Sequence, residues 1–344
     1  MSRLPDPAPG DKRRWAIYLV AVAGFVISMF YRVSTGVISL DLARELSLSA
    51  VQTGRISSAF FYAFAVSQLP LILVLGRLGP RYTMSLLSLV AVAGSVVFGF
   101  ADSYQAAVTG RALLGVGMSC HLMGTMALLA AWFPVDRFAT LSGILLGTAT
   151  VGNIAAATPL ALLNQAVGWR VSFLIMAVLT AVQGVTLFLI ARDRPEGAEP
   201  PAEAKENPFK GLGKLLAMPA YWGISFATFS RYGTFVALQG LWAFPYLTLG
   251  LKFGEVEAAN VILMLGVGSM IGPPLLGRLS DHHFRTRKWV AAPALAVVAF
   301  VLASFPLLSP DTPHLVVHAL FFAGGFCWTG PGLVLYAHIK ELVP

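Results

Sequence analysis

Long apolar stretches alternate with short polar segments along most of the chain. Each stretch is close to the roughly 20 residues that a helix needs to cross the hydrocarbon core of a bilayer. No long segment shows the period-2 alternation of a membrane β-strand, so the pattern predicts helices. About ten spans are predicted, at residues 15–40, 52–76, 82–101, 104–133, 138–163, 169–191, 219–249, 256–278, 289–308 and 314–338.

One long polar segment, residues 193–218, interrupts this pattern and separates six predicted spans from four. Its Glu, Pro and Ala content is typical of a flexible linker. The other connections are short, which predicts that consecutive helices are antiparallel neighbours. We therefore expect an N-terminal six-helix bundle over residues 1–192, a linker over 193–218 and a C-terminal four-helix bundle over 219–344.

Composition agrees with a lipid environment, because 57% of the residues are hydrophobic and only 12% are charged. Soluble domains average about 25% charged residues. The net charge of +8 does not indicate nucleic-acid binding, since 17 of the 24 Lys and Arg residues fall at the N-terminus or in alternate connections. This asymmetry predicts a multi-pass protein of the inner cell membrane, with the N-terminus and the linker in the cytoplasm.

Three arginines, Arg32, Arg111 and Arg231, fall inside predicted spans, whereas every Asp and Glu falls in a connection or at a span end. An ionised side chain at the bilayer centre costs about 2.5–3.5 kcal/mol on insertion scales. Guanidinium groups bind carboxylate and phosphate through two parallel hydrogen bonds. The arginines therefore favour a small anionic substrate, although Arg111 could be structural and Arg231 could cap backbone carbonyls near Gly233.

Polar residues also recur along the first predicted span. Ser28, Arg32, Thr35 and Ser39 are spaced at i, i+4, i+7 and i+11, which places them on one helix face. Such a stripe is expected to line an aqueous path rather than to face lipid.

His121 and His318 are the titratable side chains that we consider for proton coupling, because histidine can carry a proton near neutral pH. The alternative is that each is a hydrogen-bonded packing residue. Exchange of one anion for another would require neither, so a coupling proton and a counter-anion both remain open.

A short sequence echo links the two halves of the chain. Leu75-Gly76-Arg77-Leu78 follows the second span, and Leu276-Gly277-Arg278-Leu279 follows the eighth, which is the second span of the second half. Parallel repeats of this kind occur in secondary transporters. Gly143 and Gly147, spaced four residues apart, and Gly152 predict close helix packing in the fifth span.

These echo segments resemble the cytoplasmic loop motif of the major facilitator superfamily. Gly277, Leu279, Asp281, Arg285 and Arg287 carry the motif in the second half. In the first half it is matched by Gln68, Pro70, Arg77, Gly79 and Arg81, and Gly76 replaces its usual aspartate. Further likeness over about residues 15–340 is carried by Arg111-Ala112-Leu113-Leu114-Gly115-Val116-Gly117, Trp132-Phe133-Pro134, Arg137, Gly143, Gly147, Gly152, Pro159, Gly168-Trp169-Arg170, Phe173 and residues 233–247.

Within that superfamily, Tyr31-Arg32-Val33 and Ser58-Ala59-Phe60-Phe61-Tyr62 resemble the branch of organic-anion (anion:cation) symporters. The resemblance implies alternating access between two helical bundles, with Tyr31 and Tyr62 in the substrate site. It also implies gating loops, which would contain Arg77, Gly79, Arg81, Gly277, Asp281 and Arg285. The family has twelve helices and this sequence ends after the tenth, so the last two are expected to be absent from it.

The sequence thus predicts a monomeric secondary transporter of a small anion, all-α and polytopic, which works by symport or anion exchange. No enzyme activity, cofactor, metal or nucleic-acid partner is expected. One alternative is an exporter of amphipathic drug-like compounds, although three arginines disfavour a cationic drug. Another is a non-transporting membrane scaffold or sensor derived from this fold, for which Gly76 and the expected loss of two helices are the support.

Overall fold

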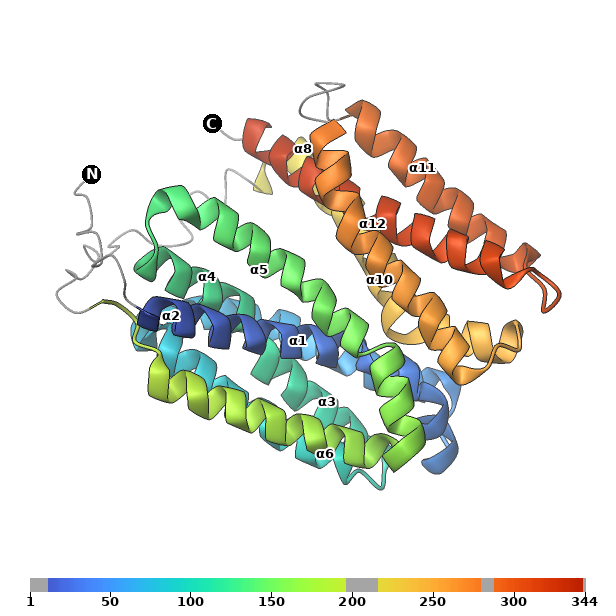
Figure 1. Cartoon of the computed structure of the whole chain (residues 1–344), viewed down its shortest axis with the longest axis horizontal. Coiled ribbons are helices and arrows are strands. Elements are labelled where there is room, and N and C mark those ends of the chain that lie inside the picture. The colour runs from blue at the N-terminus through green and yellow to red at the C-terminus, as the bar shows by residue number, and fades with distance from the viewer. Residues whose placement is uncertain (1–11, 196–215, 280–287, 343–344) are drawn as a thin grey trace. The chain divides into compact units, whose positions relative to one another are not determined.

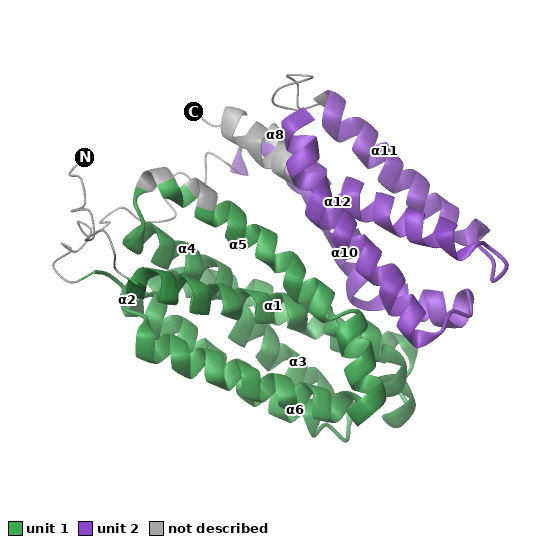
Figure 2. Ribbon diagram, in the orientation of Figure 1, with its two compact units in different colours: residues 1–198 green, residues 199–344 purple. Residues whose placement is uncertain are grey.

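The computed structural model describes residues 12–195, 216–279 and 288–342, and helices account for almost all of these ranges, with no strand among them. The chain divides into two compact units, unit 1 over Met1–Ala198 and unit 2 over Glu199–Pro344 (Figure 2). Each unit has its own packed helices.

Unit 1 begins with a helix that runs beyond the predicted first span. In the described part of this unit, α1 packs against α4, α5 and α6, while α2 packs along α3 and α6 (Figure 1). The helices are α1 (Lys12–Glu45), α2 (Ala50–Gly99), α3 (Tyr104–Met118), α4 (His121–Trp132), α5 (Val135–Ala155) and α6 (Thr158–Ile190).

The start of α2 is fixed by a reciprocal side-chain cap. The backbone N–H of Gln52 donates to the hydroxyl of Ser49 at 3.3 Å, and the backbone N–H of Ser49 donates to Oε1 of Gln52 at 2.9 Å. This arrangement satisfies two N–H groups that have no partner within the helix. It sets where the second predicted span begins.

Glycine kinks interrupt both α2 and α6. Gly79 has φ +76° and Gly168 has φ +78°, a left-handed conformation that glycine adopts without the steric penalty of a β-carbon. The kinks lie between the predicted spans 52–76 and 82–101 and between 138–163 and 169–191. Among the described residues, six helical stretches are long and apolar enough to cross a membrane, namely 12–45, 50–99, 104–132, 141–190, 255–278 and 289–307. The count of ten spans therefore stays a prediction.

The core of unit 1 contains a cluster of aromatic rings from three helices. Phe98 of α2 lies against Trp169 and Phe173 of α6, with ring centroids 5.4 and 4.6 Å apart. Tyr31 of α1 completes the cluster at 6.1 Å from Phe173. These rings hold α1, α2 and α6 together beside the candidate site described below.

The fifth predicted span departs from its expected packing. Gly143 and Gly147 of α5 are exposed, and a methyl group at either position would meet nothing within 4 Å. Within unit 1 these two glycines therefore do not bring helices close together, contrary to expectation. Gly152 is different, because a methyl group there would collide with the carbonyl of Val26 in α1. Spacing alone did not show which glycines face a neighbour.

In unit 2, α12 is the helix against which the others pack, with contacts to α8, α10 and α11. Trp328 of α12 is fully buried, and its indole N–H donates to the hydroxyl of Thr234 in α8 at 3.3 Å. The elements are α8 (Pro219–Ala237), π-helical turns at Leu238–Trp242 and Tyr246–Gly250 on either side of α9 (Ala243–Pro245), α10 (Glu255–Arg278), α11 (Lys288–Ser304), a 3₁₀ turn (Phe305–Leu307) and α12 (His314–Leu342).

Candidate functional site

Arg111 of α3 is a fully buried cation in unit 1. Its Nη1 donates to the backbone carbonyl of Tyr31 in α1 at 2.8 Å. Its Nε and Nη2 have no hydrogen-bond acceptor among the described residues, and no carboxylate of those residues pairs with it. A buried charge without a partner is costly, so an external anion would be a stabilising addition at this point.

The guanidinium of Arg111 lies on an aromatic ring that connects it with Arg32. The Cζ atom of Arg111 is 4.8 Å from the ring centroid of Phe60, and that of Arg32 is 4.7 Å from the centroid of Phe64. Phe60 and Phe64 are one turn apart on α2 and stack at 6.2 Å with 19° between their planes. We call these four side chains the arginine–phenylalanine stack. It brings two of the predicted arginines to adjoining rings, where each gains cation–π attraction.

Tyr31 supports this stack from the interior of unit 1. Its side chain is fully buried, its hydroxyl donates to Ser95 Oγ at 3.0 Å, and it shares a hydrogen bond with Thr180 Oγ1 at 3.1 Å. Ser95 in turn donates to the carbonyl of Phe173 at 2.8 Å. These bonds fix the part of α1 whose carbonyl holds Arg111. Contact between the Tyr31 hydroxyl and a substrate stays a prediction.

The hydroxyls of the predicted polar stripe are buried rather than open to water in this conformation. Ser28 donates to the carbonyl of Met118 at 3.3 Å, and Ser39 donates to that of Gly36 at 2.7 Å. The hydroxyl of Thr35 has no partner in the described part of the chain. Arg32 is half-buried, and Tyr62 of α2 is 72% exposed. The stripe therefore combines packing contacts with one hydroxyl that still has unused hydrogen-bonding capacity.

The two histidines both make hydrogen bonds. In unit 1, Nε2 of the fully buried His121 lies 3.3 Å from Ser88 Oγ, and Thr125 donates to the His121 carbonyl at 2.6 Å. In unit 2, Nδ1–H of His318 donates to the carbonyl of His314 at 2.8 Å. This geometry is that of the packing alternative, and a coupling role for either histidine stays a prediction.

In the described part of unit 2, Arg231 of α8 is a buried arginine. Its Nη1 donates to the backbone carbonyl of Trp328 in α12. Arg231 therefore caps a carbonyl, as the alternative interpretation anticipated, although the carbonyl belongs to α12 and not to the region of Gly233.

The first predicted gating loop contacts a carboxylate from another part of the chain, which its sequence motif did not reveal. The backbone N–H of Arg81 donates to Oδ1 of Asp193 at 2.7 Å, and Nε of Arg81 donates to the carbonyl of Phe188 at 2.9 Å. A methyl group on Gly79 would collide with the Asp193 carboxylate. Asp193, at the end of α6, thus places a negative charge beside a loop in which Gly76 occupies the usual aspartate position.

The remaining gating residues are less informative. Arg77 is exposed, and Gly277 lies at the end of α10. Asp281 and Arg285 lie outside the described residues. Sequence reasoning also missed Phe64 and Asp193. The four-residue spacing of Phe60 and Phe64 could have indicated an aromatic face on α2, and the alternation Arg192-Asp193-Arg194 could have indicated a polar contact.

Long apolar helices that bury charged side chains define a multi-pass membrane protein. The sequence pattern of the Major Facilitator Superfamily matches residues 20–344, and the chain belongs to that family. The relatives include proteins named as transporters, and this chain is a transporter of the same superfamily.

Two curated relatives and one solved structure illustrate the range of similarity. The chain is 28% identical to the chloramphenicol resistance protein of Streptomyces lividans, over 90% of this chain and 76% of that protein. It is 24% identical to the probable L-galactonate transporter of Escherichia coli K12, over 88% of this chain and 72% of that protein. A bacterial homologue of the human lysosomal transporter Spinster, inward-facing and unoccupied, matches with TM-score 0.77 at 18% identity, over 98% of this chain and 77% of that chain. The structural likeness shows the fold alone.

Proposed function

We propose that this protein is a secondary transporter of a small organic anion and that Arg111 is the central anion-binding group. One observation carries the proposal, namely that the two N–H donors of Arg111 without an acceptor are Nε and Nη2. These two groups lie on the same edge of the guanidinium and form the fork that binds a carboxylate through two parallel hydrogen bonds. The third group, Nη1, is already held by the Tyr31 carbonyl, which fixes the direction of the fork.

Arg32 is the second binding group in this proposal. It shares the arginine–phenylalanine stack with Arg111, is half-buried, and lies on the helix that also carries Thr35. Two guanidinium groups on adjoining rings create a positive field in a low-dielectric environment, which attracts anions and repels cations. In unit 2, Arg231 is the corresponding candidate, and Trp328 fixes its position through the carbonyl contact.

The name of one relative supports an organic anion as the substrate. L-Galactonate, named for one of them, is a sugar acid that carries a carboxylate. The other relative is named for chloramphenicol resistance, which favours a second candidate function, export of an amphipathic compound. A buried guanidinium fork without a carboxylate partner supports the first candidate more strongly, because a neutral compound would leave the charge of Arg111 uncompensated.

The test is stabilisation of the purified protein by a panel of mono- and dicarboxylates, measured as a shift in melting temperature. Ligand binding to the native state stabilises in proportion to ln(1 + [L]/Kd), so a bound anion gives a concentration-dependent shift. We expect the shift for at least one carboxylate, and its loss in Arg111→Gln but not in Arg170→Gln. A wild-type protein that no anion stabilises, or an Arg111→Gln variant with the full shift, would contradict the proposal.

A further inference from the structure

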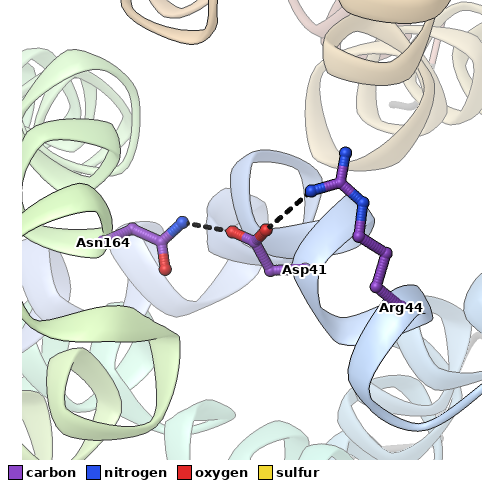
Figure 3. Close-up of polar contacts among 3 residues, drawn as sticks. All are labelled: Asp41, Arg44 and Asn164. Atoms are coloured by element: carbon purple, nitrogen blue, oxygen red, sulfur yellow. Dashed lines mark hydrogen bonds and ion pairs between the residues drawn. The ribbon is translucent and has the colours of Figure 1, made fainter.

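The last turns of α1 carry charged residues that belong to none of the sites above. Asp41 lies four residues before the end of this helix, and its Oδ2 accepts a hydrogen bond from Nδ2 of Asn164 in α6 at 2.6 Å (Figure 3). On the other side of the carboxylate, Nη1 of Arg44 lies 3.8 Å from Oδ1. The Arg44 side chain is 73% exposed, so water screens its charge. The buried partner of Asp41 is thus a neutral amide.

Asn164 has an unused acceptor at this contact. The residue is only 9% exposed, and its Oδ1 receives no hydrogen bond from any described residue. In Figure 3 the amide nitrogen points toward Asp41 while this oxygen points away from it. A buried acceptor without a donor carries the full desolvation penalty of that group. Ionised Asp41 cannot relieve this penalty because a carboxylate only accepts hydrogen bonds.

Protonation of Asp41 supplies the hydrogen-bond donor that Oδ1 of Asn164 lacks. A carboxylic acid has one O–H donor in addition to its carbonyl acceptor. After rotation of the Asn164 amide about its last side-chain bond, an acid and an amide can form two antiparallel hydrogen bonds, from O–H to Oδ1 and from Nδ2–H to the acid carbonyl. In the protonated pair, both Nδ2–H and Oδ1 of Asn164 are hydrogen-bonded. In the ionised pair, only Nδ2–H is.

We propose that Asp41 and Asn164 form a proton-binding site, in which Asp41 takes up one proton from water and donates it in a hydrogen bond to Oδ1 of Asn164. The step forms one O–H bond on the carboxylate, removes one proton from hydronium and transfers no electrons. The charge of the pair changes from −1 to zero. Arg44 then no longer faces a negative charge at Asp41, and its exposed side chain stays in water.

Two other charged groups close to the pair in the chain are matched with one another. Glu45, one turn further along α1, pairs with Arg170 of α6 at 3.2 Å. Arg170 also donates to the carbonyl of Ala101, in the connection between α2 and α3, at 2.5 Å. Arg32 lies nine residues earlier on α1, about 13 Å away along the helix axis at 1.5 Å per residue. Among these groups, Asp41 is the carboxylate that faces an amide with an unused acceptor.

The use of this proton in transport rests on the proposed function, whereas the proton site itself does not. A monoanion moved together with one proton carries no net charge. Each pH unit of gradient can then drive about a tenfold accumulation of the anion, since a tenfold concentration ratio corresponds to one unit of pH. The site would thereby favour symport over exchange of one anion for another.

Infrared difference spectroscopy of the full chain in lipid, between neutral and acidic buffer, tests the proton site without any substrate. Protonated carboxyl groups have a distinct C=O stretching band, and ¹³C-labelling of aspartate assigns the band to aspartic acid. We expect an Asp41 band in the wild type that is lost in Asp41→Asn and retained in Glu45→Gln. An aspartic acid band of unchanged intensity in Asp41→Asn would overturn the proposal.

A second variant keeps the test decisive if Asp41→Asn does not fold. Asn164→Leu has a side chain of similar size without the amide, so the acid carbonyl and its O–H lose their partners. The Asp41 band should then move to higher frequency, as expected for a carboxylic acid with weaker hydrogen bonds. An identical band frequency in wild type and Asn164→Leu would show that the amide does not bind the acid form, and would overturn the proposal.

Proteoliposomes separate this inference from the proposed function. With an imposed pH gradient of one unit, uptake of a carboxylate identified by the melting screen should reach about tenfold accumulation in wild type and Glu45→Gln. Asp41→Asn should show no accumulation above equal concentrations. Accumulation in Asp41→Asn equal to wild type would overturn the coupling role of the site. If no anion is transported by the wild type, the proposed function fails, while the infrared bands still decide whether Asp41 and Asn164 bind a proton.

Discussion

Arg111 and Arg170 are two arginines of unit 1 whose surroundings differ in one respect. Each lies on an aromatic ring, Arg111 at 4.8 Å from the centroid of Phe60 and Arg170 at 4.3 Å from that of Trp169. Each donates to a backbone carbonyl of another element, at 2.8 and 2.5 Å. Arg170 also has a carboxylate, Glu45, at 3.2 Å, whereas Arg111 has none in the described residues.

This difference separates a structural arginine from a binding arginine. Arg170 is half-exposed, and the protein itself supplies its anion, so its contribution is to fix the end of α1 beside α6. Arg111 is fully buried, and its carboxylate-binding edge has no acceptor. Charge and aromatic contacts alone therefore do not identify a functional arginine. The informative feature is a desolvated donor pair for which the protein supplies no partner.

The largest expected effect is a loss of anion binding when Arg111 is replaced with Met. Arg170→Met is the matched comparison. Two charge-assisted hydrogen bonds are each worth about 1.5–3 kcal/mol, so Arg111→Met should weaken anion binding by about 100-fold or more. The same change should leave the melting temperature of the ligand-free protein equal or higher, because it removes an uncompensated buried charge. Arg170→Met should instead keep anion binding. Melting curves with and without the anion measure both quantities, and a lower ligand-free melting temperature in Arg111→Met with normal binding would reverse the two roles.

A smaller effect is expected at Arg32, where charge and geometry can be separated. Arg32→Lys keeps the charge but loses the planar fork, so affinity should fall by about tenfold, as for the loss of one hydrogen bond to a charged group. Arg32→Gln loses the charge as well and should bind more weakly than the lysine variant. Isothermal titration of the purified variants with the same anion measures the order. Equal affinity in wild type and Arg32→Gln would remove Arg32 from the site.

Replacing the aromatic ring under Arg32 should have a more moderate effect on anion affinity. Phe64→Leu removes the ring under Arg32 but keeps an apolar side chain, and a cation–π contact is worth about 0.5–2 kcal/mol. Anion affinity should therefore fall by about twofold to thirtyfold. Trp169→Leu, under the structural Arg170, is the matched control and should lower the melting temperature without changing affinity. An unchanged affinity in Phe64→Leu would show that the stack does not position Arg32.

The smallest effect is expected at the ion pair of Arg170. The side chains of Arg170 and Glu45 are 36% and 48% exposed, and exposed ion pairs contribute about 0–1 kcal/mol. Glu45→Gln should therefore lower the free energy of unfolding by less than about 1 kcal/mol, and high salt should reduce the difference further. Denaturant titration at low and high ionic strength measures this effect. A loss of several kcal/mol would show that Arg170 depends on its carboxylate far more than its exposure indicates.

The helical fold and its family could be predicted from the sequence, but the positions of helix kinks and breaks could not. Apolar stretches of membrane-spanning length indicated helices, and the matched loop motifs indicated the superfamily that the comparison over residues 20–344 confirms. The kinks at Gly79 and Gly168, and the break between α3 and α4 within a single predicted span, did not follow from hydropathy. Hydropathy reports how well a segment dissolves in lipid, whereas a kink depends on backbone angles at one residue. For the same reason, Gly143 and Gly147 could not be told apart from Gly152 by spacing.

By itself, the sequence determined that three arginines lie in predicted spans that contain no acidic residue, because hydropathy and charge can be read position by position. The tertiary structure decided which atoms of these arginines are already used. It turned the Nη1 of Arg111 to the carbonyl of Tyr31, 80 residues away, and placed Asn164 beside Asp41, 123 residues away. Such contacts depend on the rotation and axial offset of one helix against another. A helix pattern fixes which residues share a face, but not which face of the next helix they meet.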